Sequence, residues 1–374
     1  MDKQKRKLKL CIFLSDPLKV YYQKGEIKEG YYNPKGIFDE VHIVSFCDKD
    51  IDEEKVQEVA GRGKLFIHCL AQADFINIFS LLSLRNKIMD LIKNISPDAI
   101  RAYDASLRGA LACYCAKKLH VISFVSIHTD YDEQRKYDKR PALKLRKFLE
   151  RYVLANADIV ICVSEHVKAY ALRYRKGPIE IVYNSVDLGR FKKEKDKFTD
   201  SAVVNILCVG RLNAGKNQEC LIKAIQHLDV KLTLVGDGNL YGYLTKMTRE
   251  LNIEGKVNFV KSVPHREIHR YYQEADIFAI SSRYEGFCIP LIEAMACALP
   301  IVASDIPAIR EVVNGCGVLV ENYPAAFRNE FQRLIRDVDF SRELGKKGME
   351  RARMFDLSDA EEKQGRIYEE AIKL

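Results

Sequence analysis

The chain has 374 residues, a formal net charge of +8, 47% hydrophobic residues and 30% charged residues. This composition excludes a disordered or low-complexity chain, and the length exceeds one ordinary domain, so we expect two domains of roughly 150–200 residues each. The positive charge suits a protein that binds anions, but charge alone does not distinguish nucleic acid, an acidic lipid surface and a phosphorylated small molecule.

The first half of the chain alternates short β-branched apolar runs with helical stretches, a pattern typical of parallel sheets covered by helices. The predicted strands are Lys9–Leu14, Glu40–Phe46, Lys64–Leu70, Asp98–Arg101, Val121–Ile127, Asp158–Val163 and Glu180–Tyr183. The predicted helices are Asp74–Lys93, Leu107–Leu119, Ala142–Ala155 and Glu165–Arg173.

A polar connector, Asp187–Ser201, precedes a second run of the same kind. Its predicted strands are Val203–Val209, Lys231–Val235, Lys256–Val260, Asp276–Ile280, Pro300–Ala303 and Gly317–Val320. We therefore expect an α/β fold of two Rossmann-like, doubly wound domains that face each other across a cleft. The expected boundaries are 1–186, 187–357 and a C-terminal helix, 358–374, that packs back on the N-terminal domain. Ligands of such sheets bind beyond the carboxyl ends of the strands.

The loop after the strand ending at Val209 reads Gly210-Arg-Leu-Asn-Ala-Gly-Lys216-Asn217 and leads into a predicted helix, Gln218–Leu228. Backbone amides, Arg211 and Lys216 together favour an anion there; the alternative is a solvated turn with incidental charges. The loop also matches most of the phosphate-loop pattern of NTPases, but Asn217 stands where that pattern needs Ser or Thr for Mg²⁺.

A second loop, Ser281-Ser-Arg-Tyr-Glu285-Gly286-Phe287-Cys288-Ile289-Pro290, leads into the helix that carries Glu293. The amides of Phe287, Cys288 and Ile289 would face an anion at the helix start. Since carboxylates repel phosphate and accept hydrogen bonds from sugar hydroxyls, Glu285 and Glu293 could hold two sugars that bracket a diphosphate. The alternative is that Glu285 is a surface loop residue and Glu293 a first-turn helix residue, and that neither binds a ligand.

The spacing Glu285-x7-Glu293, with Gly210, Arg211 and Lys216 upstream, resembles the signature of family-4 retaining glycosyltransferases of GT-B fold. The segments Val182–Asp187, Leu234–Gly238 and Pro300–Asp305 extend the resemblance over roughly 180–320. The resemblance implies transfer of a sugar from a UDP- or GDP-sugar to a hydroxyl of a glycan or lipid-linked acceptor, with retention of configuration.

By position, the resemblance implies that Arg211 and Lys216 bind the donor diphosphate, with Gly210 opening their loop. Glu293 would bind the ribose, and Glu285 the transferred sugar. His128, at a strand end, resembles the family's histidine near the donor sugar, although a lone histidine is often structural.

Two departures from the family pattern affect the expected pocket. The glycine pair usual after the first strand is replaced by Gln23-Lys24-Gly25-Glu26. Cys288 replaces a common glycine, and its side chain is expected to constrict the donor-sugar pocket. Two rival functions stay open: a non-catalytic nucleotide-sugar binder and a phosphate-loop NTPase.

Metal and cofactor are not expected. Asp48-Lys-Asp50 and Asp130-Tyr-Asp132 could each be an Asp-x-Asp metal motif, but both lie in the first domain, away from the expected donor site. Arg211, Lys216 and helix-terminal amides already offset the diphosphate charge.

The window Arg135–Arg151 holds eight basic residues against Asp138 and Glu150. It is interpreted either as a solvated helix face or as a surface that docks on an anionic membrane. Nucleic acid is not expected, because no recognised binding motif accompanies the charge.

No stretch reaches the roughly 18 apolar residues that span a bilayer, and Leu10–Leu14 is too short for a signal-peptide core. We therefore expect a protein that is either free in the cytoplasm or peripheral on the inner face of the membrane. The eleven cysteines have no zinc-site spacing and are expected to be buried free thiols, as at Cys11, Cys69, Cys162 and Cys208.

Overall fold

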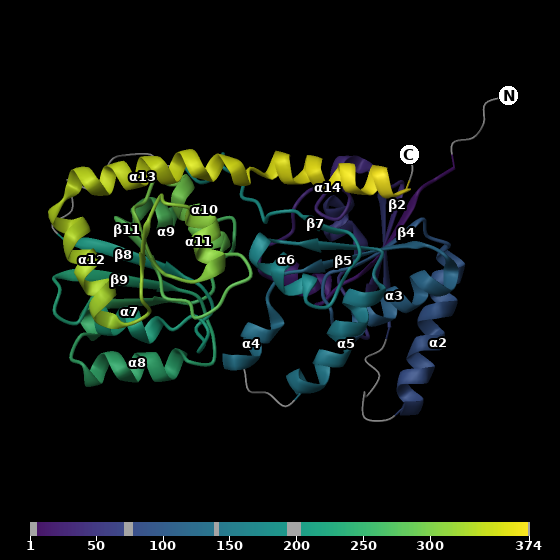
Figure 1. Ribbon diagram of the computed structural model, residues 1–374, viewed down its shortest axis with the longest axis horizontal. Helices are drawn as coiled ribbons and strands as arrows, with labels where there is room; N and C mark the ends of the chain where they lie inside the picture. Colours follow the sequence, from purple (N-terminus) through teal and green to yellow (C-terminus); the bar gives the residue numbers. More distant parts are fainter. Residues whose placement is uncertain (1–5, 71–77, 138–141, 193–202, 373–374) are drawn as a thin grey trace.

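The computed structural model describes residues 6–70, 78–137, 142–192 and 203–372. They form two α/β domains side by side, with the C-terminal helices running along both (Figure 1). The predicted Asp74 helix start and most of the Asp187–Ser201 connector lie outside the described residues.

The N-terminal domain is built on a seven-stranded parallel sheet of order β3-β2-β1-β4-β5-β6-β7. Its strands are β1 (Lys9–Phe13), β2 (Glu40–Ser45), β3 (Lys64–Cys69), β4 (Ala99–Ala102), β5 (Ile122–Ile127), β6 (Ile159–Cys162) and β7 (Ile179–Ile181). Its helices are α1 (Leu18–Gln23), α2 (Ile78–Ile95), α3 (Leu107–Leu119), α4 (Tyr131–Tyr137), α5 (Ala142–Asn156) and α6 (Glu165–Leu172).

The C-terminal domain has a six-stranded parallel sheet of order β10-β9-β8-β11-β12-β13. Its strands are β8 (Val204–Val209), β9 (Val230–Val235), β10 (Val257–Val260), β11 (Ile277–Ile280), β12 (Ile301–Ser304) and β13 (Val318–Val320). The helices are α7 (Gln218–Ala224), α8 (Tyr241–Glu250), α9 (His269–Glu274), α10 (Ile289–Ala296), α11 (Pro307–Val313), α12 (Pro324–Arg336), α13 (Val338–Ala352) and α14 (Leu357–Ile372).

The strand order reverses between β1 and β4 in the first sheet and between β8 and β11 in the second. Loops diverge at such switch points and leave a crevice at the carboxyl ends of the strands. The expected fold of two Rossmann-like domains is therefore confirmed. The loops that carry the candidate site follow β8 and β11.

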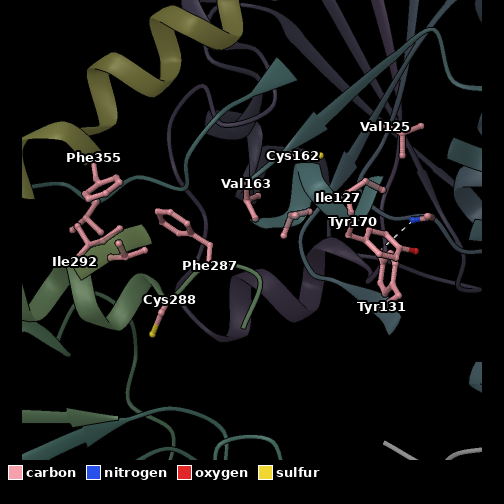
Figure 2. Packing of buried hydrophobic residues seen from close by; sticks show 14 of the residues in the cluster. Val125, Ile127, Tyr131, Cys162, Val163, Tyr170, Phe287, Cys288, Ile292 and Phe355 are labelled. Carbon is pink, nitrogen blue, oxygen red and sulfur yellow. Dashed lines mark hydrogen bonds between the residues drawn. The ribbon is translucent and has the colours of Figure 1, made fainter. Parts of the chain in front are cut away.

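One apolar core runs through both domains and includes the residues of Figure 2. The Phe287 ring packs 5.6 Å from Tyr183 and 5.6 Å from Phe355, between centroids, so the loop after β11 is anchored against both domains. The relative position of the two sheets is thus fixed by burial close to the site.

The helix α14 returns to the N-terminal domain (Figure 1). The chain crosses over where Val186 forms a bridge with Asp356, and the buried Tyr368 then packs its ring edge-on against Phe38 and Phe124. Among the described helices, none is both long and apolar enough to span a bilayer.

The cysteine prediction is correct except near β3. All eleven cysteines are free thiols, and nine are buried, but Cys47 is half-buried and Cys69 is exposed. Cys69 ends β3, the strand at the edge of the sheet, and its sulfur accepts from the Asp50 amide at 3.3 Å.

Candidate active site

The loops that follow β8 and β11 meet through an ion pair. The Lys216 ammonium lies against Oε1 of Glu285, and the Ser282 hydroxyl donates to the same oxygen at 2.6 Å. Burial disfavours the Lys216 charge, but Glu285 outweighs it, so the pKa of Lys216 is raised. A cation and a carboxylate are therefore held side by side in a largely desolvated place, where each interacts strongly with a polar ligand.

The other residues of the first loop are arranged around this pair. The Gly210 amide donates to the Val235 carbonyl at 2.9 Å, and the Arg211 side chain is exposed at the loop surface. The helix that follows, α7, ends at Ala224, four residues before the prediction. Asn217 is bonded through its amide group to Asn322 and Arg283, both at 2.9 Å. Because both ends of this amide are occupied, Asn217 does not offer the free Mg²⁺ ligand that a phosphate loop requires.

Glu293 is 3% exposed on α10 and has two side-chain partners. The Tyr272 hydroxyl donates to Oε2 at 2.5 Å, and Nε2 of His265 lies 3.3 Å from Oε1. Burial and Glu293 together raise the pKa of Tyr272 well above its ordinary value, so the phenol stays protonated and donates. This arrangement fixes the carboxylate in one orientation.

Sequence reasoning missed both partners of Glu293. Tyr272 lies on the short helix α9, and His265 follows the strand β10 directly after Val263-Pro264. The position of His265 beyond the carboxyl end of a parallel strand was the available signal. Nothing in the sequence around Tyr272 indicated that it would face α10.

The residues that lead into α10 are mostly buried. Phe287 and Cys288 are 8% and 1% exposed, Ile289 is the first helical residue, and Pro290 is the second. Burial is the main cause of a raised pKa of the Cys288 thiol, with Glu285 adding to it. The thiol is therefore neutral and lies beside the Lys216–Glu285 pair.

His128 follows β5 in the N-terminal domain and is half-buried. A β-carbon built on Gly286 would lie 1.8 Å from the His128 carbonyl oxygen, so the two loops touch. The Ser164 hydroxyl donates to the Gly286 carbonyl at 2.7 Å from the same side of the cleft. Burial, and to a smaller extent the Arg101 charge, lower the pKa of His128 to about 4. The imidazole is neutral at physiological pH.

The segment after α1 also reaches across the cleft. The Lys24 carbonyl accepts from the His265 amide at 3.2 Å, and Gly25 has a φ of +66°, which favours glycine. Burial lowers the pKa of Lys28, whereas the nearby Glu293 opposes that shift. The segment that replaces the usual glycine pair therefore brings Lys28 toward Glu293.

Two adjoining cavities lie between the domains. One is lined by Arg101, Tyr103, His128 and Ile289, and the other by Arg190, His265, Glu293 and Ile289. Both are also lined by Lys28 and Glu29. His128 and Glu293 thus face one continuous cleft, whereas Lys216 and Glu285 are not among the residues that line these two cavities.

The two acidic pairs have structural partners. Asp50 accepts from the amides of Leu18 (2.9 Å) and Lys19 (2.7 Å) at the start of α1. Asp130 accepts from the amides of Asp132 (2.8 Å) and Glu133 (3.0 Å) in α4. In the described ranges no group of three or more His, Cys, Asp or Glu side chains could hold a metal ion.

The basic window Arg135–Arg151 is divided between α4 and α5, and its residues 138–141 lie outside the described residues. Arg135 bonds to Glu150 and to Asp132, while Arg146 and Lys147 lie 3.6 and 3.3 Å from the same two carboxylates. These three residues therefore form an ion-pair network with Asp132 and Glu150, which offsets part of the positive charge of the window. Phe148, in contrast, is 70% exposed.

The sequence matches two glycosyltransferase family models. A family model described as glycosyl transferases group 1 matches residues 190–351, and one described as glycosyltransferase family 4 matches residues 39–190. An uncharacterized glycosyltransferase of Methanocaldococcus jannaschii is 24% identical, and the match covers 88% of this chain and 90% of that protein.

A Campylobacter jejuni N-acetylgalactosamine-N,N'-diacetylbacillosaminyl-diphospho-undecaprenol 4-alpha-N-acetylgalactosaminyltransferase is 31% identical over 57% of this chain and 60% of its own length. Among solved structures, sucrose-phosphate synthase of Thermosynechococcus elongatus has a TM-score of 0.77 at 20% identity, covering 98% and 99% of the two chains. Anabaena HepE in complex with UDP-glucose has a TM-score of 0.75 at 17% identity, covering 98% and 100%. These structures share the fold.

Proposed function

Because the chain belongs to the family-4 glycosyltransferases of GT-B fold, we propose that it moves a sugar from a UDP- or GDP-sugar to a hydroxyl of a glycan or lipid-linked acceptor, with retention of configuration. The observation that carries the proposal is the loop after β11: its Glu285 pairs with Lys216, and the adjoining Gly286 packs on the His128 carbonyl of the other domain. Glu293 lies on α10, the helix that follows this loop.

In this proposal Glu293 binds the ribose hydroxyls. Tyr272 and His265 already hold its carboxylate in place, so little ordering is needed when the nucleotide binds. Arg211 and Lys216 take the diphosphate, together with the loop that begins at Gly210 and the amides of Phe287, Cys288 and Ile289. When the diphosphate binds, the Lys216 ammonium interacts with both the phosphates and the Glu285 carboxylate.

Glu285 then accepts from hydroxyls of the transferred sugar beside Gly286, and Lys216 stabilises the charge that develops on the leaving diphosphate. His128 is neutral at pH 7, so it contributes a hydrogen bond to the sugar without repelling or attracting charge. The reaction proceeds without a metal ion or other cofactor, because Arg211 and Lys216 already offset the diphosphate charge.

A lipid-linked acceptor is supported by the name of the Campylobacter relative, which describes transfer to a diphospho-undecaprenol-linked sugar. A uridine donor is supported by the likeness to HepE in complex with UDP-glucose. Both names describe those proteins, and here they direct the choice of substrates to test.

The test is a thermal-shift screen of nucleoside diphosphates and their sugars, followed by transfer to candidate acceptors with the anomeric configuration read by NMR. Stabilisation by a UDP- or GDP-sugar and a product of retained configuration are expected. Stabilisation by ATP alone would favour the NTPase alternative. Donor binding without turnover on any acceptor would favour a non-catalytic binder.

We further propose that the enzyme docks peripherally on an anionic membrane surface through residues 135–151. The exposed Phe148 supports this, since basic segments with an exposed aromatic side chain are typical of interfacial helices. Phe148→Ser should reduce binding to phosphatidylglycerol vesicles at low salt. The control Leu172→Ser, which removes a 56% exposed leucine from α6, should not. Failure of the wild-type protein to bind these vesicles at low salt would exclude the proposal.

A further inference from the structure

Arg101 is a buried cation at the inner wall of the cleft. It lies on β4 and is 3% exposed. Its guanidinium donates to the Tyr368 hydroxyl of α14, to the Ser126 hydroxyl at 3.0 Å and to the Gln364 side chain at 3.3 Å. The Tyr103 ring lies 4.4 Å from the guanidinium carbon. The side chain is therefore held rigidly by three elements.

The charge of Arg101 has no counter-ion in the described part of the chain. Its three hydrogen-bond partners are neutral groups, and its Nε has no hydrogen-bond partner among the described residues. A buried charge without an opposite charge is costly, and proteins normally pair it. The effect of the charge is felt nearby, because Arg101 contributes to the lowered pKa of His128.

The same cavity holds a second buried polar group, the Tyr103 hydroxyl. It has no hydrogen-bond partner in the part of the chain that the structure describes, and Tyr103 lines the cavity together with Arg101, Ser126 and His128. The Tyr103 ring stacks on His128 with centroids 6.2 Å apart. Two unpaired donors, one of them charged, are thus placed next to the histidine that faces the donor loop.

A role in holding α14 does not account for this arrangement. Tyr368 is already fixed by its edge-on packing against Phe38 and Phe124, and a neutral side chain could supply the hydrogen bonds to Tyr368 and Gln364. The planar guanidinium fork, by contrast, matches the oxygens of a phosphate or carboxylate. The charge itself is what lacks an explanation inside the described chain.

We propose that the acceptor carries an oxyanion, a phosphate or a carboxylate, which Arg101 binds in this cavity with the help of Tyr103. The reacting hydroxyl of the acceptor then lies toward His128 and the donor sugar. This inference rests on the proposed function, since it identifies the chemical class of the acceptor for the same site.

The probes are inorganic phosphate and acetate, titrated by calorimetry into protein saturated with UDP or GDP, whichever stabilises it. Wild-type protein should bind at least one probe, and the stronger of the two identifies the class of oxyanion. Arg101→Gln should weaken that binding at least tenfold. The control Tyr368→Phe keeps the charge and should change it less than threefold.

Three outcomes would overturn the proposal: no binding of either probe by nucleotide-saturated wild-type protein, equal binding by Arg101→Gln, or competition between probe and nucleotide. Even if Arg101→Gln fails to fold, the absence of probe binding by nucleotide-saturated wild type would overturn the proposal. If no nucleotide binds, the titration is repeated on Arg211→Ala with Lys216→Ala. If phosphate still binds in an Arg101-dependent way but the protein transfers no sugar, the proposed function is refuted. The anion site at Arg101 is then supported independently of that function.

Discussion

Gly286 packs directly on the main-chain carbonyl of His128, so closely that a β-carbon on the glycine would lie 1.8 Å from the carbonyl oxygen. Gly286 follows Glu285 in the C-terminal domain, and His128 ends a strand region of the N-terminal domain. The contact sets how far the histidine stands from the loop that carries Glu285. Only a residue without a side chain permits it, because the atom in the way belongs to the backbone.

We expect Gly286→Ala to push the two loops apart and lower kcat/KM at least tenfold, while each domain stays folded. Misplacement of about an ångström at a reacting centre is enough for such a loss. The matched control is Gly242→Ala on α8, where nothing lies within 4 Å of the added carbon. The control should keep full activity. Equal activity of both variants would contradict the role given to this contact.

Glu293→Ala should weaken binding of the free nucleotide, because it removes the proposed ribose partner and leaves the buried Tyr272 hydroxyl unpaired. A loss of about 1–3 kcal/mol is the usual scale for such a change. Tyr272→Phe, which keeps the ring and frees the carboxylate, should have a smaller effect in the same direction. Glu285→Ala should weaken binding of the nucleotide-sugar more than that of the nucleotide. Calorimetry with both ligands measures this, and equal effects of both glutamate variants would defeat the assignment.

The sequence predicted the parts of the fold and site that depend on local pattern. Every strand of both sheets lies within about two residues of its prediction, because apolar runs between helical segments determine parallel strands. Lys216 and Glu285 were found because each follows a buried strand.

Contacts between distant elements left no such local signal. Arg101 and Tyr368 are 267 positions apart, and Tyr272 meets Glu293 only because α9 packs beside α10. The ion pairs of Arg135, Arg146 and Lys147 depend on how α4 and α5 turn toward each other. A helical pattern indicates which face is apolar, but it does not identify the partner that a charged residue on that helix will meet.

His128 gives a prediction for pH. Its pKa is lowered in the folded protein to about 4, against 6.5 for an ordinary histidine. Between these values the unfolded chain binds a proton that the folded protein does not, so the free energy of unfolding falls as pH falls from about 6.5 to 4. His128→Asn should lose less stability than wild type over this window, measured as melting temperature. The comparison with wild type is needed because His42 and His68 also have lowered pKa values.

In the wild-type enzyme the neutral imidazole should persist throughout the usual working range. The profiles of kcat/KM against pH of wild type and His128→Asn should therefore agree near pH 6.5. Wild type should show no inflection there that is lost in the variant. Such an inflection would mean that the imidazole titrates normally in the cleft.

Metal dependence separates the proposed mechanism from that of glycosyltransferases that bind a metal ion through an Asp-x-Asp motif. Transfer should persist in excess EDTA, and Asp48→Asn, at an exposed position, should leave donor affinity within about threefold, under ~1 kcal/mol. Asp50→Asn should instead lower the melting temperature, because Asp50 accepts from the amides of Leu18 and Lys19 at the start of α1. Arg211→Ala combined with Lys216→Ala should remove nearly all turnover, since these cations take the place of the metal at the diphosphate. Complete loss of activity in EDTA, restored by Mn²⁺, would overturn the metal-free mechanism.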